Sequence, residues 1–251
     1  MSVGNLPITA LAMALLLATT SRAEAADVYL AIASNFATPA KELQVLYEQT
    51  TYNKLKISFG SSGKHFAQIV NGAPFELFLS ADVARAKRAV AENYAVDSSR
   101  FTYAIGKLVL YSATPELIDN EGKVLSANVF NRLAIANPKT APYGEAAVTL
   151  LRSLGLYKSI RKKIVTGENI AQTYQFVATG NADIGFVAYS QISGHQLGSR
   201  WLVPTGHYPA IRQQAVLLKK GIDNPAATEF LSFLKSAVAK GIIKKYGYEV
   251  D

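Results

Sequence analysis

The chain has 251 residues, 49% of them hydrophobic, a formal net charge of +8 at pH 7 and no cysteine. This length allows one large domain or two of about 110 residues each. The lack of cysteine excludes disulfides, thiol nucleophiles, thiolate metal sites and a lipid-modified cysteine. The basic residues are scattered along the chain, which argues against nucleic acid as a partner.

Residues 1–25 are predicted to be a secretory signal peptide. Ile8–Thr20 is an apolar run too short to span a bilayer, which needs about 20 such residues, and Ala23-Glu24-Ala25 follows it as an A-x-A cleavage site. Met1–Pro7 contains no Lys or Arg, an irregular feature for such a signal. We expect the remaining residues to be exported and free in solution, without a lipid anchor.

Strand-like and helix-like segments alternate through the first part of this exported chain. In order they are a strand at Asp27–Ile32, a helix at Pro39–Gln49, a strand at Leu55–Phe59, a helix between Gly63 and Gly72, a strand at Phe75–Ser80, and a helix from Asp82, its N-cap, to about Asn93. Alternation of this kind predicts an α/β fold with largely parallel sheets.

The second part of the chain repeats the pattern. In order it contains strands at Lys107–Tyr111 and Leu133–Ala136, the loop Asn137–Gly144, a helix that Gly155 ends, a strand at Lys163–Val165, a helix from Glu168-Asn169, a strand at Ile184–Val187, and the extended segment Tyr208–Leu218. In a last predicted helix, Asn224 is the N-cap and Pro225 lies in the first turn. The side of this helix expected to be buried carries Phe230, Phe233, Leu234 and Val238. Because no flexible linker is present, we expect two lobes joined by crossing strands, with Lys107–Tyr111 and Tyr208–Leu218 as candidates.

Two short polar loops follow predicted strands and precede predicted helices. They are Ala33-Ser34-Asn35-Phe36 and Gly60-Ser61-Ser62-Gly63. Helix starts offer unpaired N–H groups and the positive end of the helix dipole, so two of them facing one cleft would hold an anion. The alternative is that these serines are ordinary helix caps, with Ser61 capping while Ser62 faces solvent.

Other catalytic and binding motifs are not supported. Gly63-Lys64 resembles the end of a phosphate loop, but no glycine stands five residues earlier and His65 replaces the required Ser or Thr. The three histidines are too dispersed for a metal motif, and no G-x-S-x-G nucleophile elbow occurs. We therefore expect neither a cofactor nor a metal ion ligated by protein side chains.

Four blocks taken together resemble the periplasmic molybdate-binding proteins of ABC transporters, within the two-domain periplasmic binding-protein superfamily. They are Ala31–Phe36 (AIASNF), Phe59–Gly63 (FGSSG), Gly72–Asp82 (GAPFELFLSAD) and Lys245–Tyr248 (KYGY). The resemblance implies two α/β lobes joined by crossing strands, of the type II kind, with a ligand cleft between them. It assigns residues 26–106 plus 213–251 to lobe 1 and residues 107–212 to lobe 2.

The resemblance also implies a set of oxyanion ligands. Carried over to this sequence, they are Ser34, Ser62, Tyr143 and Ile170, the last two through backbone N–H groups, with Asn35 as a further candidate and Ser61 as a weaker one. Many relatives place a Tyr after the last cleft strand, but here Ala188 stands at that position and Tyr189 follows it. A shift of one residue turns a side chain to the other face of a strand, so Tyr189 is a doubtful ligand.

By this resemblance the chain is a periplasmic receptor, not an enzyme, that captures molybdate and tungstate and delivers them to an inner-membrane ABC permease. We expect a monomer. The alternatives are a receptor for another tetrahedral oxyanion such as sulfate or phosphate, and a secreted enzyme acting on an anionic substrate. A regulator's effector-sensing domain shares the fold, but the signal peptide and the missing helix-turn-helix argue against it.

Overall fold

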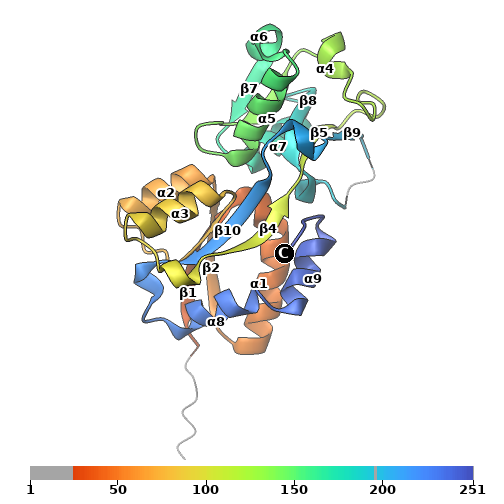
Figure 1. Ribbon diagram of the computed structural model, residues 1–251. Helices are drawn as coiled ribbons and strands as arrows, with labels where there is room; N and C mark the ends of the chain where they lie inside the picture. Colours follow the sequence, from red (N-terminus) through yellow and green to blue (C-terminus); the bar gives the residue numbers. More distant parts are fainter. Residues whose placement is uncertain (1–24, 195–196, 251) are drawn as a thin grey trace, which may run out of the picture.

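The computed structural model describes residues 25–194 and 197–250, so residues 1–24 of the predicted signal peptide lie outside the described residues. The described part forms two α/β lobes, one above the other in Figure 1, each built on one five-stranded sheet. Two clusters of buried side chains lie in each lobe, one on either face of its sheet. The predicted α/β class is confirmed, but both sheets are mixed rather than largely parallel.

Lobe 1 contains a sheet of strand order β2-β1-β3-β10-β4. Its strands are β1 (Asp27–Ala33), β2 (Lys54–Gly60), β3 (Leu77–Ser80), β4 (Phe101–Gly106) and β10 (Ile211–Leu217). Its helices are α1 (Ala37–Thr51), α2 (Ser62–Val70), α3 (Val83–Ala91), α8 (Pro225–Phe233) and α9 (Ala237–Lys245), with the short 3-10 turns η1 (Ser34–Phe36), η2 (Asp97–Ser99) and η6 (Lys219–Gly221). Strand β1 pairs in parallel with β2 and β3, whereas β10 runs antiparallel to β3 and β4.

Lobe 2 has the same plan, with strand order β7-β6-β8-β5-β9. Its strands are β5 (Leu108–Ser112), β6 (Leu133–Ala136), β7 (Ile164–Gly167), β8 (Ile184–Ala188) and β9 (Ser199–Leu202). Its helices are α4 (Val124–Ala127), α5 (Pro142–Ser153), α6 (Tyr157–Ile160) and α7 (Ile170–Ala178), with the 3-10 turns η3 (Arg161–Lys163), η4 (Tyr189–Gln191) and η5 (Thr205–His207). Strand β6 is parallel to its neighbours β7 and β8, and β5 is antiparallel to β8 and β9.

The chain crosses between the lobes twice. It leaves lobe 1 at the end of β4 and returns as β10, and these two antiparallel strands lie side by side below lobe 2 in Figure 1. Of the two candidate crossing segments, Tyr208–Leu218 contains β10, but all of Lys107–Tyr111 except Lys107 belongs to β5 of the lobe 2 sheet. The strand at Phe101–Gly106, which the sequence pattern does not predict, takes its place at the crossing.

Local signals explain most helix boundaries. Asp82, Asn169 and Asn224 accept hydrogen bonds from N–H groups of the helices that they cap, and Gly72 and Gly155 adopt positive φ where α2 and α5 end. Helix α1 ends at Tyr52, in the left-handed conformation.

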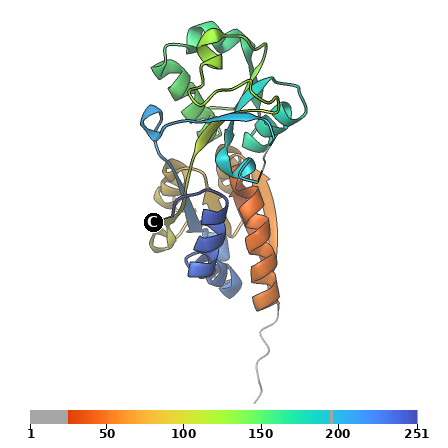
Figure 2. The same ribbon diagram turned by 90° about the vertical axis from the view of Figure 1, so that its right-hand side faces the viewer.

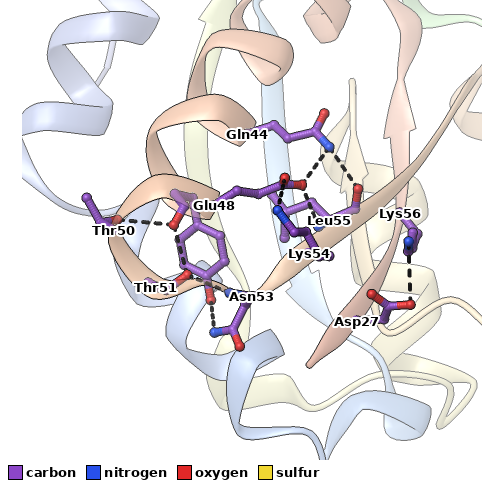
Figure 3. Close-up of polar contacts among 10 residues, drawn as sticks. Asp27, Gln44, Glu48, Thr50, Thr51, Asn53, Lys54, Leu55 and Lys56 are labelled. Carbon is purple, nitrogen blue, oxygen red and sulfur yellow. Dashed lines mark hydrogen bonds and ion pairs between the residues drawn. The ribbon is translucent and has the colours of Figure 1, made fainter. Parts of the chain in front are cut away.

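Side chains of α1 hold it to the start of β2, as Figure 3 shows. Glu48 Oε1 accepts from the N–H of Leu55 at 2.9 Å, and Gln44 Nε2 donates to the Leu55 carbonyl at the same distance. Glu48 also pairs with Lys54 at 3.1 Å. These bonds fix the helix whose first residues follow the polar turn η1.

The predicted last helix is two helices, and its predicted stripe is partly wrong. Ser236 caps a new helix by accepting from the N–H of Ala239, so α9 starts in a different rotational phase from α8. Val238 is therefore 58% exposed, while Ile243 is buried against lobe 1. Figure 2 shows α9 beside α1, where Lys245 pairs with Glu42.

Candidate functional site

A small cavity lies between the lobes. It encloses about 190 Å³ of empty space, part of it open to solvent. Its lining residues are Ala33, Ser34, Asn35, Gly60, Ser61, Ser62, Ala81, Ala141, Pro142, Tyr143 and Ile170. The first seven follow the carboxyl ends of β1, β2 and β3, and the last four stand at the starts of α5 and α7. None of these described lining residues carries a charge.

Ser34 contributes a buried hydroxyl that has no hydrogen-bond partner within the described residues. Its side chain is 5% exposed, and the turn η1 has no side-chain cap, so Ser34 is not serving as a helix cap. A buried polar atom without a partner costs about 1–3 kcal/mol. A guest in the cavity with an acceptor oxygen would remove that cost.

Ser61 and Ser62 have different roles. Ser61 caps α2, because its Oγ accepts from the N–H of Lys64 at 3.4 Å. Ser62 does not face solvent: it is fully buried, and its Oγ accepts from the N–H of Ala81 at 2.9 Å. Since the Ala81 N–H occupies a lone pair of Ser62, the hydroxyl proton remains available to donate into the cavity.

Asn35 lines the cavity, but its side-chain amide is engaged elsewhere. Nδ2 donates to Gln213 Oε1 at 2.8 Å and to the Tyr248 hydroxyl at 2.9 Å. An amide nitrogen has two hydrogens, so both are used. The side-chain amide of Asn35 therefore positions the peptide next to Ser34 and has no hydrogen left for a guest.

Lobe 2 contributes the first turns of two helices. Asn169 Oδ1 accepts from the N–H groups of Ala171 and Gln172, which leaves the N–H of Ile170, the first residue of α7, without an intrahelical acceptor. Helix α5 begins with Pro142, which has no N–H, so Tyr143 carries the first donor of that helix. Both helices point the positive ends of their dipoles at the cavity.

The Tyr143 side chain leads away from the cavity wall. Its hydroxyl lies 3.4 Å from Gln213 Nε2, and it packs so closely on Gly106 that a Cβ there would be 2.0 Å from the Tyr143 oxygen. Burial raises the pKa of Tyr143 well above its usual range, so the hydroxyl stays protonated.

Tyr189 is not among the residues that line the cavity. It lies in η4, and its ring packs on Gly247, where a Cβ would be 2.2 Å from the ring carbon Cδ1. The side chain of Gln191, two residues later, joins the end of β8 to the start of α7: its Oε1 accepts from the N–H of Ala188, and its Nε2 donates to the Ile170 carbonyl. Nothing in the local sequence singles out Gln191, because its contacts depend on how α7 and β8 pack.

The two lobes touch along the rim of the cavity. The N–H of Gly63 donates to the Thr140 carbonyl at 2.9 Å, and Arg85 Nη2 donates to the Lys139 carbonyl at 2.9 Å. Lys64 and Glu168 form an exposed ion pair across the same gap. The described structure is therefore a closed arrangement of the lobes.

Asp82, Arg85 and His65 lie near the cavity but are not among its lining residues. Asp82 pairs with Arg85 beside the cavity. His65 lies buried behind Gly60, with Nε2 at 3.2 Å from the Ile32 carbonyl, and burial lowers its pKa, so its ring is neutral near pH 7.

Two other features are absent from residues 25–194 and 197–250. No group of three or more histidine and carboxylate side chains there could hold a metal ion. No helix in the same ranges combines the length and the apolar character that a bilayer crossing requires. What the cavity offers is a set of uncharged hydroxyl and backbone donors that converge from two lobes.

Comparisons with known proteins agree with this arrangement. The family model for bacterial extracellular solute-binding proteins matches residues 28–249. The chain is 50% identical over 242 residues to the molybdate-binding protein ModA of Rhodobacter capsulatus, covering 96% of each sequence. It is 51% identical over 229 residues to the molybdate-binding protein ModA of Azotobacter vinelandii, covering 90% of this chain and 91% of that one.

A solved structure leads to the same family. The periplasmic molybdate-binding protein of Azotobacter vinelandii superposes with a TM-score of 0.87 at 41% identity, over 89% of this chain and 99% of that one. These relatives are binding proteins, and the chain is likewise a binding protein and not an enzyme. The chain belongs to the family of these ModA proteins, within the bacterial extracellular solute-binding proteins.

Proposed function

We propose that this chain captures molybdate, and also tungstate, in the periplasm and delivers it to an ABC permease in the inner membrane. The observation that carries the proposal is the unpartnered, buried hydroxyl of Ser34 in a cavity whose described lining is uncharged. The half-identical relatives named molybdate-binding proteins support the choice of ligand.

The proposed ligands are Ser34 and Ser62 through their hydroxyls, and Tyr143 and Ile170 through backbone N–H groups. Asn35 is proposed to contribute through its backbone, since its side-chain amide is occupied. Hydrogen bonds to a charged partner contribute about 1.5–3 kcal/mol each, so a handful of them supports nanomolar to micromolar binding after the costs of association.

Donor-only chemistry favours a fully ionised guest. A protonated oxyanion would bring a hydrogen that meets other donors, and that mismatch disfavours its binding. Among dianions, selection then depends on the size of the cavity. Molybdate and tungstate are larger than sulfate, so a cavity shaped for them would leave sulfate with longer and weaker hydrogen bonds.

The protein is proposed to act as a soluble monomer after removal of residues 1–25, without a lipid anchor. Closure of the lobes on the oxyanion creates a surface that the permease can distinguish from that of the open form. The crossing strands β4 and β10 are the proposed hinge.

Calorimetric titration of the purified protein with molybdate, tungstate, sulfate and phosphate tests the proposal. We expect tight binding of molybdate and tungstate, and binding of the other two weaker by at least about 100-fold, which is about 2.7 kcal/mol. Ser62→Ala should weaken molybdate binding at least about tenfold, whereas Ser236→Ala, which removes a helix cap remote from the cavity, should leave it unchanged. Equal affinity for sulfate would overturn the ligand assignment.

A further inference from the structure

Six buried, uncharged polar side chains form a network behind the anion cavity. They are Asn35, Tyr103, Tyr143, Ser190, Gln213 and Tyr248. They come from both lobes and from the two crossing strands, although Asn35 is 178 residues from Gln213 and 213 residues from Tyr248 in sequence. Of the six, only Asn35 and Tyr143 line the cavity.

The network holds the cavity wall at Asn35. The Tyr248 hydroxyl lies 2.8 Å from the Asn35 carbonyl and 2.9 Å from Asn35 Nδ2, and Gln213 Oε1 accepts the second amide hydrogen. Asn35 belongs to η1, a turn of three residues with no side-chain cap. Such a short 3-10 turn has little internal stabilisation, so these outside bonds set the orientation of the Ser34-Asn35 segment.

The same hydroxyl joins the lobes. Ser190 of lobe 2 donates to the Asn35 carbonyl at 2.8 Å, and its Oγ lies 2.9 Å from the Tyr248 hydroxyl. The hydroxyl of Tyr143, also of lobe 2, lies 3.4 Å from Nε2 of Gln213 on β10. These contacts require the lobes to be closed, because opening the cleft would draw Ser190 and Tyr143 away from lobe 1.

Tyr248 is itself anchored on the proposed hinge. The next residue, Glu249, exchanges two backbone hydrogen bonds with Ile105 of β4, at 2.7 and 3.1 Å, and its side chain pairs with Lys107 at 3.0 Å. Gln213, the other partner of Asn35, lies in β10 where its register with β4 shifts. The C-terminal segment therefore connects the cavity wall directly to the strands that cross between the lobes.

We propose that Tyr248 is a positioning residue that holds the Ser34-Asn35 wall in its binding orientation and latches the closed lobes, so that it slows release of the bound oxyanion. This inference rests on the proposed function, because it concerns the same cavity. Tyr248 does not line the cavity, and its effect on the guest is transmitted through Asn35.

The test is Tyr248→Phe, which keeps the ring on Phe36, at 5.5 Å between centroids, and removes only the hydroxyl. Tyr246→Phe is the matched control, since its hydroxyl lies in the same C-terminal segment but bonds Glu42 within lobe 1. Bound radioactive molybdate is chased with excess unlabelled molybdate, and affinity is measured by calorimetry. We expect Tyr248→Phe to release molybdate about 10- to 100-fold faster with little change in association rate, and Tyr246→Phe to match the wild type.

A second measurement needs no ligand. In the ligand-free protein, Tyr248→Phe should speed amide hydrogen exchange at residues 34–36, which the Tyr248 hydroxyl holds within lobe 1, while Tyr246→Phe should not. Release within twofold of wild type would overturn the latch even if molybdate binds as proposed. If the wild type binds none of the four oxyanions, the proposed function fails, and the exchange measurement alone decides: faster exchange supports the positioning role of Tyr248 and unchanged exchange refutes it.

Discussion

Gly63 makes a close inter-lobe contact at the mouth of the cavity, and replacing it with alanine tests whether binding requires the closed lobes. A Cβ at Gly63 would lie 2.8 Å from Thr140 Cα and 3.1 Å from the Thr140 carbonyl oxygen, which accepts the Gly63 N–H at 2.9 Å. The obstructing atoms are largely backbone, so they cannot rotate aside. Gly63→Ala therefore acts on the closed arrangement.

The expected effects on affinity and stability have opposite signs. Forcing one methyl group into a packed contact costs about 1–3 kcal/mol, so the affinity for molybdate should fall about 5- to 150-fold. Gly63 is the second residue of α2, where alanine favours the helix by up to about 1 kcal/mol. In the ligand-free protein, opening of the lobes relieves the clash, so the free energy of unfolding should stay equal or rise.

Calorimetry with molybdate and urea unfolding without ligand measure the two quantities separately. Gly241→Ala is the matched control, because Gly241 lies in α9 and a Cβ there meets no atom within 4 Å. It should raise stability and leave affinity alone. An affinity within twofold of wild type for Gly63→Ala, or a fall in ligand-free stability that parallels the loss of affinity, would refute the reasoning.

Two further changes test the site and the fold. Ser34→Ala should weaken molybdate binding by about 10- to 150-fold while the ligand-free protein keeps its stability in urea, because the buried hydroxyl has no protein partner to lose; a matching loss of stability would contradict this. Burial raises the pKa of Tyr47 to about 12, above the ordinary value of about 10. The raised pKa contributes free energy of unfolding that is fully present below about pH 10 and is lost as the pH rises toward 12. Tyr47→Phe should therefore make the fall in unfolding free energy between about pH 10 and 12 shallower, and an unchanged slope would count against the linkage.

The parts of the site that could be predicted are those whose chemistry is local. Serines after buried strands mark helix starts whatever the rest of the chain does, and Ser34 and Ser62 both line the cavity. The alternative that Ser61 caps a helix is correct, but the burial of Ser62 could not be read locally. It depends on Ala81, whose N–H reaches Ser62 from the end of β3.

The parts that could not be predicted depend on distant segments. The Asn35 amide looks available in the sequence, but Gln213 and Tyr248 occupy it in the fold. Phe101–Gly106 becomes a strand through pairing with β10, which lies about 100 residues later. The prediction that Val238 is buried was wrong for a local reason. The cap at Ser236 starts a new helix, so the apolar spacing of the preceding helix does not continue to Val238.

The position of β10 between β3 and β4 also dictates an order of assembly. Lobe 2 is continuous in sequence and can pair all of its strands once β9 exists, whereas the lobe 1 sheet stays divided until β10 joins β3 to β4. Contacts of such long sequence separation form late and slow folding. In the proposed export, a chain threading through a membrane pore from its N-terminus leaves the facing edges of β3 and β4 unpaired until β10 has crossed, and this interval is when a chaperone on the far side has most to protect.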